Sequence, residues 1–421
     1  MFQESELQTP AEREAALFEG FSARLSDCVC ECPGLAAHLD GHDVSQIDSR
    51  AALQALPVLR KNVLIDAQQA NPPFGGFVNQ GNLAGQRIFM SPGPVWEPQL
   101  GGDDPWQGMP ALVAAGIRFG DVVHNAFSYH LTPGGFILDE AARALGCIVF
   151  PAGVGNTESQ VAALHQTRAS VYIGTPDYLQ VLLDHASDNQ RPLTHIKRAM
   201  VSGGALFPAM RSKYHEQGIH VQQCYATADL GVIAFETHTE NKVHPGMVVN
   251  EGLIVEILVP GTNTAVQPGE VGEVVVTRLH PDYPLLRFAT GDLSRELTEL
   301  SPCGRTNMRL AGWMGRADQR VKVRGMFVDP LQIAEVRRSH KEFGRVRLVV
   351  TRGNDRDEMS LHVTLTEDAS MSIGRDTTQR QNLLEGVASS LKKATSLTGS
   401  VTLVDSLPDD GIVVDDQRQY D

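Results

Sequence analysis

The feature that most constrains the fold is a regular alternation of apolar, strand-like runs with helical segments between Trp106 and His220. Strands that alternate with helices of roughly 10–15 residues indicate a mostly parallel sheet that is covered by helices. The helices are predicted at 106–118, 134–145, 157–166, 176–187 and 207–217, and the strands are DVVHNAFSY, GCIVFPA, SVYIGTP, IKRAMVSGG and IHVQQCYA.

The segments before this alternation are predicted to be mainly helical. Residues 9–27 have apolar side chains at helical spacing, with Pro10 at the first helical position. Thr9 and Glu12 have the spacing of a capping box, in which two side chains satisfy backbone N–H groups at the start of a helix. Residues 45–65 are predicted to form a short helix followed by a strand.

After Gly231 the sequence changes to strands joined by turns such as PGTNTAVQPGE, which predicts a small antiparallel or barrel-like β-subdomain at 231–317. The tail at 318–421 mixes strands with helices and is predicted to be a separate small domain. The predicted fold class is therefore α/β. Its large N-terminal domain, at 1–317, consists of helix-covered, mostly parallel sheets plus the β-subdomain, and its small C-terminal domain is α+β.

The composition excludes several classes of protein. The hydrophobic share of 42% and the charged share of 20% are those of an ordinary globular protein. A net charge of −14 argues against a nucleic-acid surface, although backbone N–H groups and a few arginines can still bind a small anion. No apolar run approaches the ~20 residues that span a bilayer, and the polar N-terminus is not a secretory signal. We therefore expect a cytoplasmic protein that binds neither nucleic acid nor membrane.

The segment RFATGDLS places Arg287, Thr290, Gly291 and Asp292 close together after a proline and a short apolar run. A Gly-Asp pair at the end of a strand suits a turn from which a carboxylate projects. Such a carboxylate can accept two hydroxyl hydrogen bonds, which is the usual way in which a ribose is held. The alternative is an Asx-type turn that only caps the strand.

Several motifs follow one another along nearly the whole chain. They are FSYHLTPGGFILDEAARALGCIVFPAGVGNTESQV, TPDYLQVLL, VSGGALFPAMR, CYATADLGVIAFE, GEVGEVVVTRL, RFATGDLS, GRADQRVKVRGMFVDPLQI and LPDDGIVVDDQR. In this order they resemble the adenylate-forming superfamily, specifically its phenylacetate–CoA ligase branch, also called coenzyme F390 synthetase-like. The resemblance implies that a carboxylate attacks the α-phosphate of ATP, that the C-terminal lid domain rotates, and that CoA displaces AMP. It implies ATP or AMP, Mg²⁺ and coenzyme A as cofactors, and an aromatic or other small carboxylic acid as substrate.

The resemblance also implies roles for individual residues. Asp292 would hold the ribose hydroxyls, Asp229 would approach Mg²⁺, and Asp318 would be the hinge between the domains. Lys322 lies in KVRG, which matches the loop that enters the site for the thioester step. For the glycines the alternative role is a tight turn, and for His130 it is a buried, hydrogen-bonded imidazole. The nucleotide would be bound by Ser202, Gly203, Gly204, Tyr225, Ala226, Thr227, Asp292 and Arg316, and the acyl pocket would be lined by Tyr129, His130, Pro133 and Gly134.

Three departures from the family pattern concern the handling of phosphate. The Ser/Thr/Gly-rich phosphate loop is replaced by RIFMSPGPVWEP at 87–98, whose prolines lack N–H donors and which contains no lysine. The Tyr motif has Ala228 at the hydroxyl position, followed by the shorter acid Asp229. The C-terminal Gly-Lys pair is Gly411-Ile412, and isoleucine cannot neutralise charge that develops at phosphorus.

A zinc site and a nucleophilic thiol are two further hypotheses. By the same resemblance, His238, His244 and Cys303 would bind a structural zinc ion with Glu236 as the fourth ligand, although the usual cysteine pair is reduced to one residue. The alternative is a pair of solvated loop histidines and a buried thiol. Cys224 precedes the Tyr motif and is either a nucleophile or, on the favoured interpretation, a small buried residue at a strand end. No GxSxG elbow is present to support hydrolysis.

Two functions are consistent with these observations. The first is an adenylate-forming carboxylate–CoA ligase of the phenylacetate–CoA ligase type. The second is a homologue that has lost adenylation and works as an acyl transferase or cyclase, or as a partner protein that binds a nucleotide or acyl-CoA. A homodimer and a carrier-protein partner are both left open.

Overall fold

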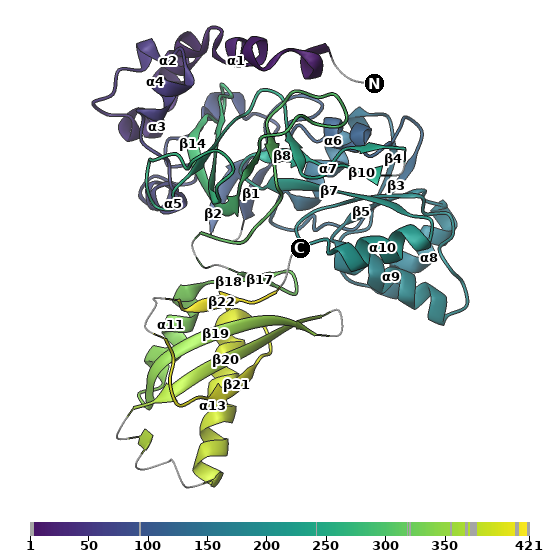
Figure 1. Ribbon diagram of the computed structural model, residues 1–421, viewed down its shortest axis with the longest axis vertical. Coiled ribbons are helices and arrows are strands. Elements are labelled where there is room, and N and C mark those ends of the chain that lie inside the picture. Colours follow the sequence, from purple (N-terminus) through teal and green to yellow (C-terminus); the bar gives the residue numbers. More distant parts are fainter. Residues whose placement is uncertain are drawn as a thin grey trace. The chain divides into compact units, whose positions relative to one another are not determined.

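The computed structural model describes residues 4–91, 94–240, 242–317, 319, 321–353, 356–366, 369–370, 377–408 and 412–418. The chain divides into two compact units, Met1–Met314 and Gly315–Asp421 (Figure 1). The boundary suggested by the sequence, at 317/318, falls at the start of the second unit. Within the described residues, no helix combines the length and the apolar character that crossing a membrane requires.

A large mixed sheet forms the centre of the first unit, and its parallel half confirms the predicted alternation of helices and strands (Figure 1). In chain order the elements are α6 (Met109–Ala114), β3 (Val122–Asn125), α7 (Gly134–Ala144), β4 (Ile148–Pro151), α8 (Thr157–Thr167), β5 (Val171–Gly174), α9 (Pro176–Asp188), β6 (Arg198–Val201), α10 (Pro208–Glu216) and β7 (His220–Thr227). Strands β3 to β7 are parallel, because a helix connects each of them to the next. Apolar side chains of these strands pack in two buried clusters, as helix-covered strands require.

The strands after β7 do not all belong to one separate subdomain, which corrects the sequence-based prediction. β8 (Gly231–Phe235) folds back from β7 and extends the large sheet antiparallel, and β11 (Met247–Val249), β16 (Arg309–Leu310) and β15 (Glu296–Leu297) continue it. The order across this sheet is β15-β16-β11-β8-β7-β6-β5-β3-β4. A second antiparallel sheet contains β12 (Ile254–Leu258), β13 (Gly272–Arg278) and β14 (Leu285–Ser294), and β9 (His238–Thr239) pairs with β10 (Lys242–Val243).

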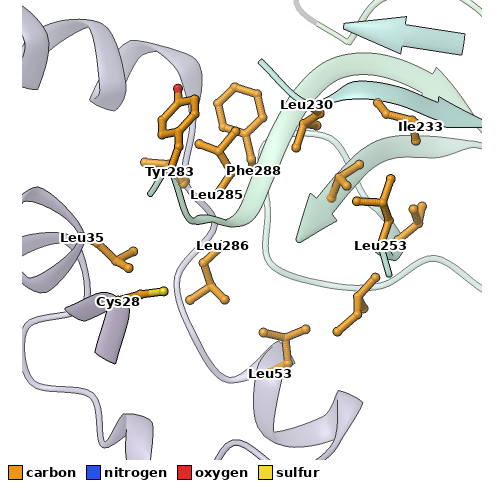
Figure 2. Close-up of a cluster of buried hydrophobic side chains, with 14 of the residues drawn as sticks. Cys28, Leu35, Leu53, Leu230, Ile233, Leu253, Tyr283, Leu285, Leu286 and Phe288 are labelled. Atoms are coloured by element: carbon orange, nitrogen blue, oxygen red, sulfur yellow. The ribbon is translucent and has the colours of Figure 1, made fainter. Parts of the chain in front are cut away.

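Helices of the N-terminal segment cover the three-stranded sheet. Figure 2 shows Cys28, Leu35 and Leu53 of these helices in one buried cluster with Leu285 and Phe288 of β14. This packing fixes the strand that carries Asp292, because burial of apolar area is the main source of stability. The helices are α1 (Pro10–Phe18), α2 (Phe21–Glu31), α3 (Pro33–His38), α4 (Arg50–Gln54) and α5 (Lys61–Ala70), with 3-10 turns η1 (Glu4–Leu7), η2 (Val44–Gln46) and η3 (Gln80–Asn82).

The N-terminal segment also differs from its prediction in two places. The helix predicted at 9–27 is divided into α1 and α2, because Gly20 adopts a left-handed conformation with a φ of +62°. The capping box is confirmed, since the backbone N–H of Thr9 donates to Glu12 Oε2 at 2.8 Å and that of Glu12 donates to Thr9 Oγ1 at 3.3 Å. The strand predicted near the end of 45–65 is wrong, because α5 begins within that segment.

The second unit is an α+β domain, as the sequence predicts. Its main sheet has the order β21-β20-β19-β22, and its apolar side chains pack with those of two helices in a core of their own. A two-residue turn at Arg324 and Gly325 joins the remaining two strands, and both residues have a positive φ, as in the turns that suit tight hairpins. The elements are β17 (Val321–Val323), β18 (Met326–Val328), α11 (Pro330–Ser339), β19 (Phe343–Gly353), β20 (Arg356–Leu365), α13 (Thr377–Thr395), β21 (Ser400–Leu403) and β22 (Val414–Asp416).

Candidate active site

Asp292 lies inside strand β14 rather than in a turn at its end, which corrects the interpretation from the sequence. Three residues of β14 lie opposite one residue of β13 at this point, so the strand forms a bulge. Gly291 within the bulge has a φ of +76°, a conformation that favours glycine. The bulge therefore explains why a glycine precedes Asp292.

Two side chains from other segments orient the Asp292 carboxylate. The hydroxyl of Tyr225, on β7, donates to Oδ2 at 2.8 Å, and the indole N–H of Trp313 donates to Oδ1 at 3.0 Å. Asp292 is 7% exposed, so this orientation is held in a largely buried setting. A carboxylate has about four acceptor positions and can accept ligand hydroxyls in addition to these two donors. Trp313 was not predicted from the sequence, because no motif separates it from an ordinary core tryptophan.

The predicted nucleotide-binding residues of β6 and β7 lie beside one another at the carboxyl ends of these strands. Ser202 Oγ donates to the carbonyl oxygen of Cys224 at 2.8 Å, and Gln223 Nε2 donates to that of Gly204 at 3.0 Å. Because β6 and β7 are parallel neighbours, their carboxyl ends form the kind of edge at which α/β sheets bind ligands. The residues brought together with Asp292 in the first unit are Ser202, Gly203, Gly204, Tyr225, Ala226 and Thr227.

Three predicted residues belong to the C-terminal part of the chain. Arg316 and Lys322 are in the second unit, so their relation to Asp292 stays a prediction. The backbone carbonyl of Lys322 accepts a hydrogen bond from Arg418 at 2.9 Å, which ties β17 to the end of its own unit. Asp318, the predicted hinge, lies outside the described residues.

Asp229 lies in the turn between β7 and β8, next to two cationic side chains. Its side chain is 1% exposed, and Lys61 Nζ of α5 lies 3.0 Å from Oδ2, although outside hydrogen-bonding geometry. The guanidinium of Arg278 donates to the backbone carbonyls of Asp229 and Leu230, at 3.0 and 2.9 Å. Burial lowers the pKa of Arg278 to about 10, so the group is still charged at neutral pH. Neither cation was predicted. Lys61 lies outside the family motifs, and Arg278 lies in GEVGEVVVTRL, where no role was assigned to it.

The segment 87–98, which stands in place of the phosphate loop, forms a hairpin of β1 (Ile88–Ser91) and β2 (Val95–Pro98). Its Glu97 is 1% exposed and lies against Asp229. Glu97 was also missed from the sequence, although it is the one acidic residue of RIFMSPGPVWEP.

The predicted acyl-pocket residues surround the start of α7. The Tyr129 hydroxyl donates to Asp139 Oδ2 at 2.7 Å, and its ring meets that of Phe136 edge-on at 5.1 Å. Burial, together with Asp139, raises the pKa of Tyr129 above its usual range. His130 is exposed, so the alternative of a buried imidazole is wrong. Pro133 and Gly134 begin the helix, and no geometry here identifies the acid that they would contact.

The four predicted zinc ligands have other partners. Glu236 accepts a hydrogen bond from Arg211 at 2.6 Å, so this carboxylate already has a cationic partner. His238 contacts Gln222 at 3.0 Å, His244 contacts Thr237 at 3.1 Å, and Cys303 contacts Ser301 at 3.0 Å. Within the described part of the chain, no group of three or more His, Cys, Asp or Glu side chains is placed to hold a metal ion. The residues therefore do not fit the predicted zinc site.

The thiol of Cys224 is buried, as the favoured interpretation of the sequence requires. It is 1% exposed and belongs to the cluster that packs beneath β7 and β8. Burial raises its pKa to about 12, so the group is a neutral thiol rather than a thiolate nucleophile.

A cavity of about 430 Å³ lies among residues other than those predicted for the site. Its lining includes Arg13, Arg50, Glu14 and Glu251. These four charges are paired with one another, Arg13 with Glu251 and Arg50 with Glu14. We therefore place the candidate site at Asp292 rather than in this cavity.

Comparison with known proteins identifies the family of the chain. Residues 129–280, which include β6, β7 and the acyl-pocket stretch, match the family model of AMP-binding enzymes. The chain is 30% identical over 329 residues to phenylacetate–coenzyme A ligase of Pseudomonas putida, covering 74% of this chain and 72% of that protein. It is 28% identical over 371 residues to the ligase of the same name from Aromatoleum evansii, covering 84% and 81%.

The fold is also that of a solved ligase. The crystal structure of 2-hydroxyisobutyryl-CoA ligase in complex with 2-HIB-AMP and CoA, in the thioesterification state, has a TM-score of 0.80 and 24% identity. The match covers 99% of this chain and 92% of that one. Together with the sequence relatives, these findings confirm the resemblance. The chain belongs to the phenylacetate–CoA ligase family of the adenylate-forming superfamily, and it is a carboxylate–CoA ligase-like protein.

Proposed function

We propose that this protein binds ATP and a small carboxylic acid beside Asp292, joins them as an acyl-adenylate, and transfers the acyl group to coenzyme A. The observation that carries the proposal is the arrangement of Tyr225, Asp292 and Trp313, in which donors from two other segments fix a mostly buried carboxylate. A carboxylate fixed in this way is suited to accept both hydroxyls of a ribose. Aromatic acids are the first substrates to test, because the relatives named above are phenylacetate–CoA ligases.

The other binding roles follow from the resemblance and the placement of the residues. Gly203 and Gly204, at the end of β6, would leave room for the flat adenine ring to approach the backbone. The acyl group would lie at the stretch from Tyr129 to Gly134. In the second unit, Arg316 would contact the nucleotide and Lys322 would act in the thioester step, after a rotation about Asp318.

Magnesium is part of this proposal, and the residues present fit it. Asp229 offers a buried carboxylate whose oxygens accept no hydrogen bond within the part of the chain that the structure describes, and hard oxygen ligands are those that Mg²⁺ prefers. The ion would supply charge neutralisation at the phosphates of ATP. Lys61, 3.0 Å from Asp229, would provide a further positive charge at the same edge.

The experiment that tests this function is carboxylate-dependent ATP–pyrophosphate exchange over a panel of aryl and short aliphatic acids. We expect exchange with at least one acid, and thioester formation when coenzyme A is added. A carrier-protein thiol should be tested as the alternative acyl acceptor. The absence of exchange with every acid, in a protein that binds AMP or acyl-CoA, would contradict the ligase function.

A second candidate function is a homologue that has lost adenylation and binds a nucleotide or acyl-CoA, or transfers an acyl group. Two observations favour it. The hairpin at 87–98 is packed against Asp229 instead of forming an open phosphate loop, and an isoleucine, Ile412, stands at the position of the family lysine. Binding of acyl-CoA without exchange would support this candidate. The cytoplasmic location and the homodimer stay predictions under either function.

A further inference from the structure

The hairpin of β17 and β18 carries Lys322, the residue that the proposed function assigns to the thioester step. These two strands form a sheet of their own, apart from the four-stranded sheet of the second unit. An isolated two-stranded hairpin is marginally stable in water, so its position depends on what holds it from outside. Part of the support is apolar, since Val321, Val323 and Val328 are buried in the core of the second unit.

The rest of the support is polar, and one guanidinium group lies at its centre. Nη1 of Arg418 donates to the backbone carbonyl of Lys322 at 2.9 Å and to Asp357 Oδ2 at 2.8 Å. Its Nε and Nη2 donate to the two oxygens of Asp416, at 2.8 and 2.6 Å. The side chains of Arg418 and Asp357 are only 6% and 8% exposed. Because a paired guanidinium and carboxylate have a fixed relative geometry, this arrangement holds the backbone of Lys322 in one place.

Asp357 also reaches the turn of the same hairpin. Its Oδ2 accepts a long hydrogen bond, of 3.4 Å, from the backbone N–H of Arg324, and its Oδ1 accepts one of 3.1 Å from Arg352. Arg324 has a φ of +48°, a conformation that residues other than glycine adopt only where their surroundings stabilise it. Its side chain donates to the backbone carbonyl of Thr398, which stabilises the turn from the other side.

The segment before Arg418 holds the beginning of the hairpin as well. The backbone N–H groups of Val413 and Val414 donate to Gln319 Oε1, at 2.7 and 3.4 Å. Gln319 directly follows the predicted hinge, Asp318. Strand β22, which pairs with β19 in the main sheet, lies next to β17 and β18 (Figure 1). The last described segment of the chain therefore ties both Gln319 and Lys322 to the sheet of the second unit.

We propose that Arg418 is a positioning residue for the thioester step, which fixes the backbone of Lys322 while two carboxylates fix its own guanidinium. The inference deepens the proposed function and rests on it, since it assumes that Lys322 acts in this step. There the sulfur of coenzyme A forms a bond to the acyl carbon, the bond from that carbon to the phosphate oxygen breaks, AMP leaves, and the thiol proton passes to the solvent. A displacement of about 1 Å at a reacting centre can slow a reaction about 100-fold, so a loosened hairpin should slow this step.

The test measures the two half-reactions separately in Arg418→Met, which keeps a long unbranched side chain without N–H donors. Adenylation is followed by carboxylate-dependent ATP–pyrophosphate exchange. Thioester formation is followed as a single turnover of supplied phenylacetyl-adenylate with saturating coenzyme A. We expect thioester formation to be slowed about 10- to 100-fold. Exchange should stay within about threefold of the wild type, because Lys322 is assigned no part in adenylation.

Hydrogen exchange followed by mass spectrometry gives a readout that does not depend on activity. In Arg418→Met, the amides of residues 319–328 should exchange faster, while those of β19 and β20 stay protected if the unit is folded. Arg347→Met is the matched control, because Arg347 of β19 is also mostly buried, 10% exposed, and pairs with Asp415 at 3.9 Å. It should leave the thioester rate and the exchange of the hairpin unchanged. Where Arg418→Met does not fold, Arg418→Lys keeps the charge but loses the planar fork, and it should slow thioester formation in the same way.

Three results would overturn the inference. They are equal slowing of both half-reactions, thioester formation at the wild-type rate, and hydrogen exchange in the hairpin that does not change. If the wild type shows no pyrophosphate exchange but converts the supplied adenylate, the proposed adenylation fails, and the role of Arg418 is still decided by the second half-reaction. A wild type that forms no thioester from the supplied adenylate would overturn the inference as well.

Discussion

Replacement of Asp292 by asparagine is expected to weaken AMP binding by about 10- to 100-fold with little effect on folding. The indole N–H of Trp313 can only donate, so the amide oxygen of the variant has to face it. The amide NH₂ group then faces Tyr225, whose hydroxyl can reverse and accept. The local hydrogen bonds survive, and the free energy of unfolding should change by about 1 kcal/mol or less.

The expected loss of AMP affinity follows from one hydrogen bond that the ribose no longer makes with residue 292. On the side of Tyr225, an acceptor becomes a donor, so one hydrogen bond between a ribose hydroxyl and a charged oxygen is lost. Such a bond contributes about 1.5–3 kcal/mol, which corresponds to roughly 10- to 100-fold in affinity. In a thermal-shift assay with AMP at 100 times the wild-type Kd, the ligand stabilises the wild type by about 2.7 kcal/mol, and a variant with 100-fold weaker binding by only about 0.4 kcal/mol.

Asp139→Asn is the matched control for this measurement. Asp139 is likewise mostly buried, 9% exposed against 7% for Asp292, and it accepts a hydrogen bond from a tyrosine, Tyr129, at 2.7 Å. The two variants therefore make the same chemical change in the same kind of pair. Asp139→Asn should leave AMP affinity unchanged. If Asp292→Asn binds AMP as tightly as the wild type, or both variants weaken it equally, Asp292 is not the ribose-binding group.

Three further predictions concern the lost lysine, the core and the buried thiol. Ile412→Lys should raise the rate of pyrophosphate exchange, by up to about 100-fold, if the rest of the site is intact, and an unchanged rate would show that this position no longer limits the reaction. Arg287→Met should lower the free energy of unfolding by about 3–5 kcal/mol in urea titrations, because it leaves Glu256, paired with Arg287 at 2.9 Å and fully buried, without its cation. Glu256→Gln keeps an acceptor for the Arg287 guanidinium, so it should lower the free energy of unfolding by a smaller amount. Cys224→Ala should retain exchange activity within about threefold, because a thiol with a pKa of about 12 is not a nucleophile at neutral pH; complete loss of activity in a folded variant would contradict this.

Sequence reasoning succeeded where the pattern is local and repeated. The alternation of helices and strands from Met109 to Thr227 has a clear period, so both the elements and the parallel sheet were predictable. It failed where long-range pairing decides the structure. Nothing in GVIAF indicates that β8 would pair with β7 and join the large sheet, because strand propensity does not specify a partner.

The same distinction applies to the site. Asp292 could be proposed for the site because its motif is short and contiguous, but its hydrogen-bond partners could not be predicted. Lys61 reaches Asp229 from a segment far away in the chain, and Trp313 lies 21 residues after Asp292. A single tryptophan or lysine has no sequence signature of its role. The zinc prediction failed for the related reason that spacing does not reveal competing partners, since Arg211 already neutralises Glu236.

The charge around Asp229 changes how the missing phosphate machinery should be weighed. From the sequence, the lost loop and Ile412 both remove positive charge from the phosphates. In the structure, Lys61 and Arg278 bring two cationic side chains to this edge, where the carboxyl groups of Asp229 and Glu97 are buried. The side chain of Lys61 is 25% exposed, so it can turn toward a ligand. Since Arg278 is committed to backbone carbonyls, we propose that Lys61 would meet the phosphates of ATP in a chain that lacks the family's phosphate loop.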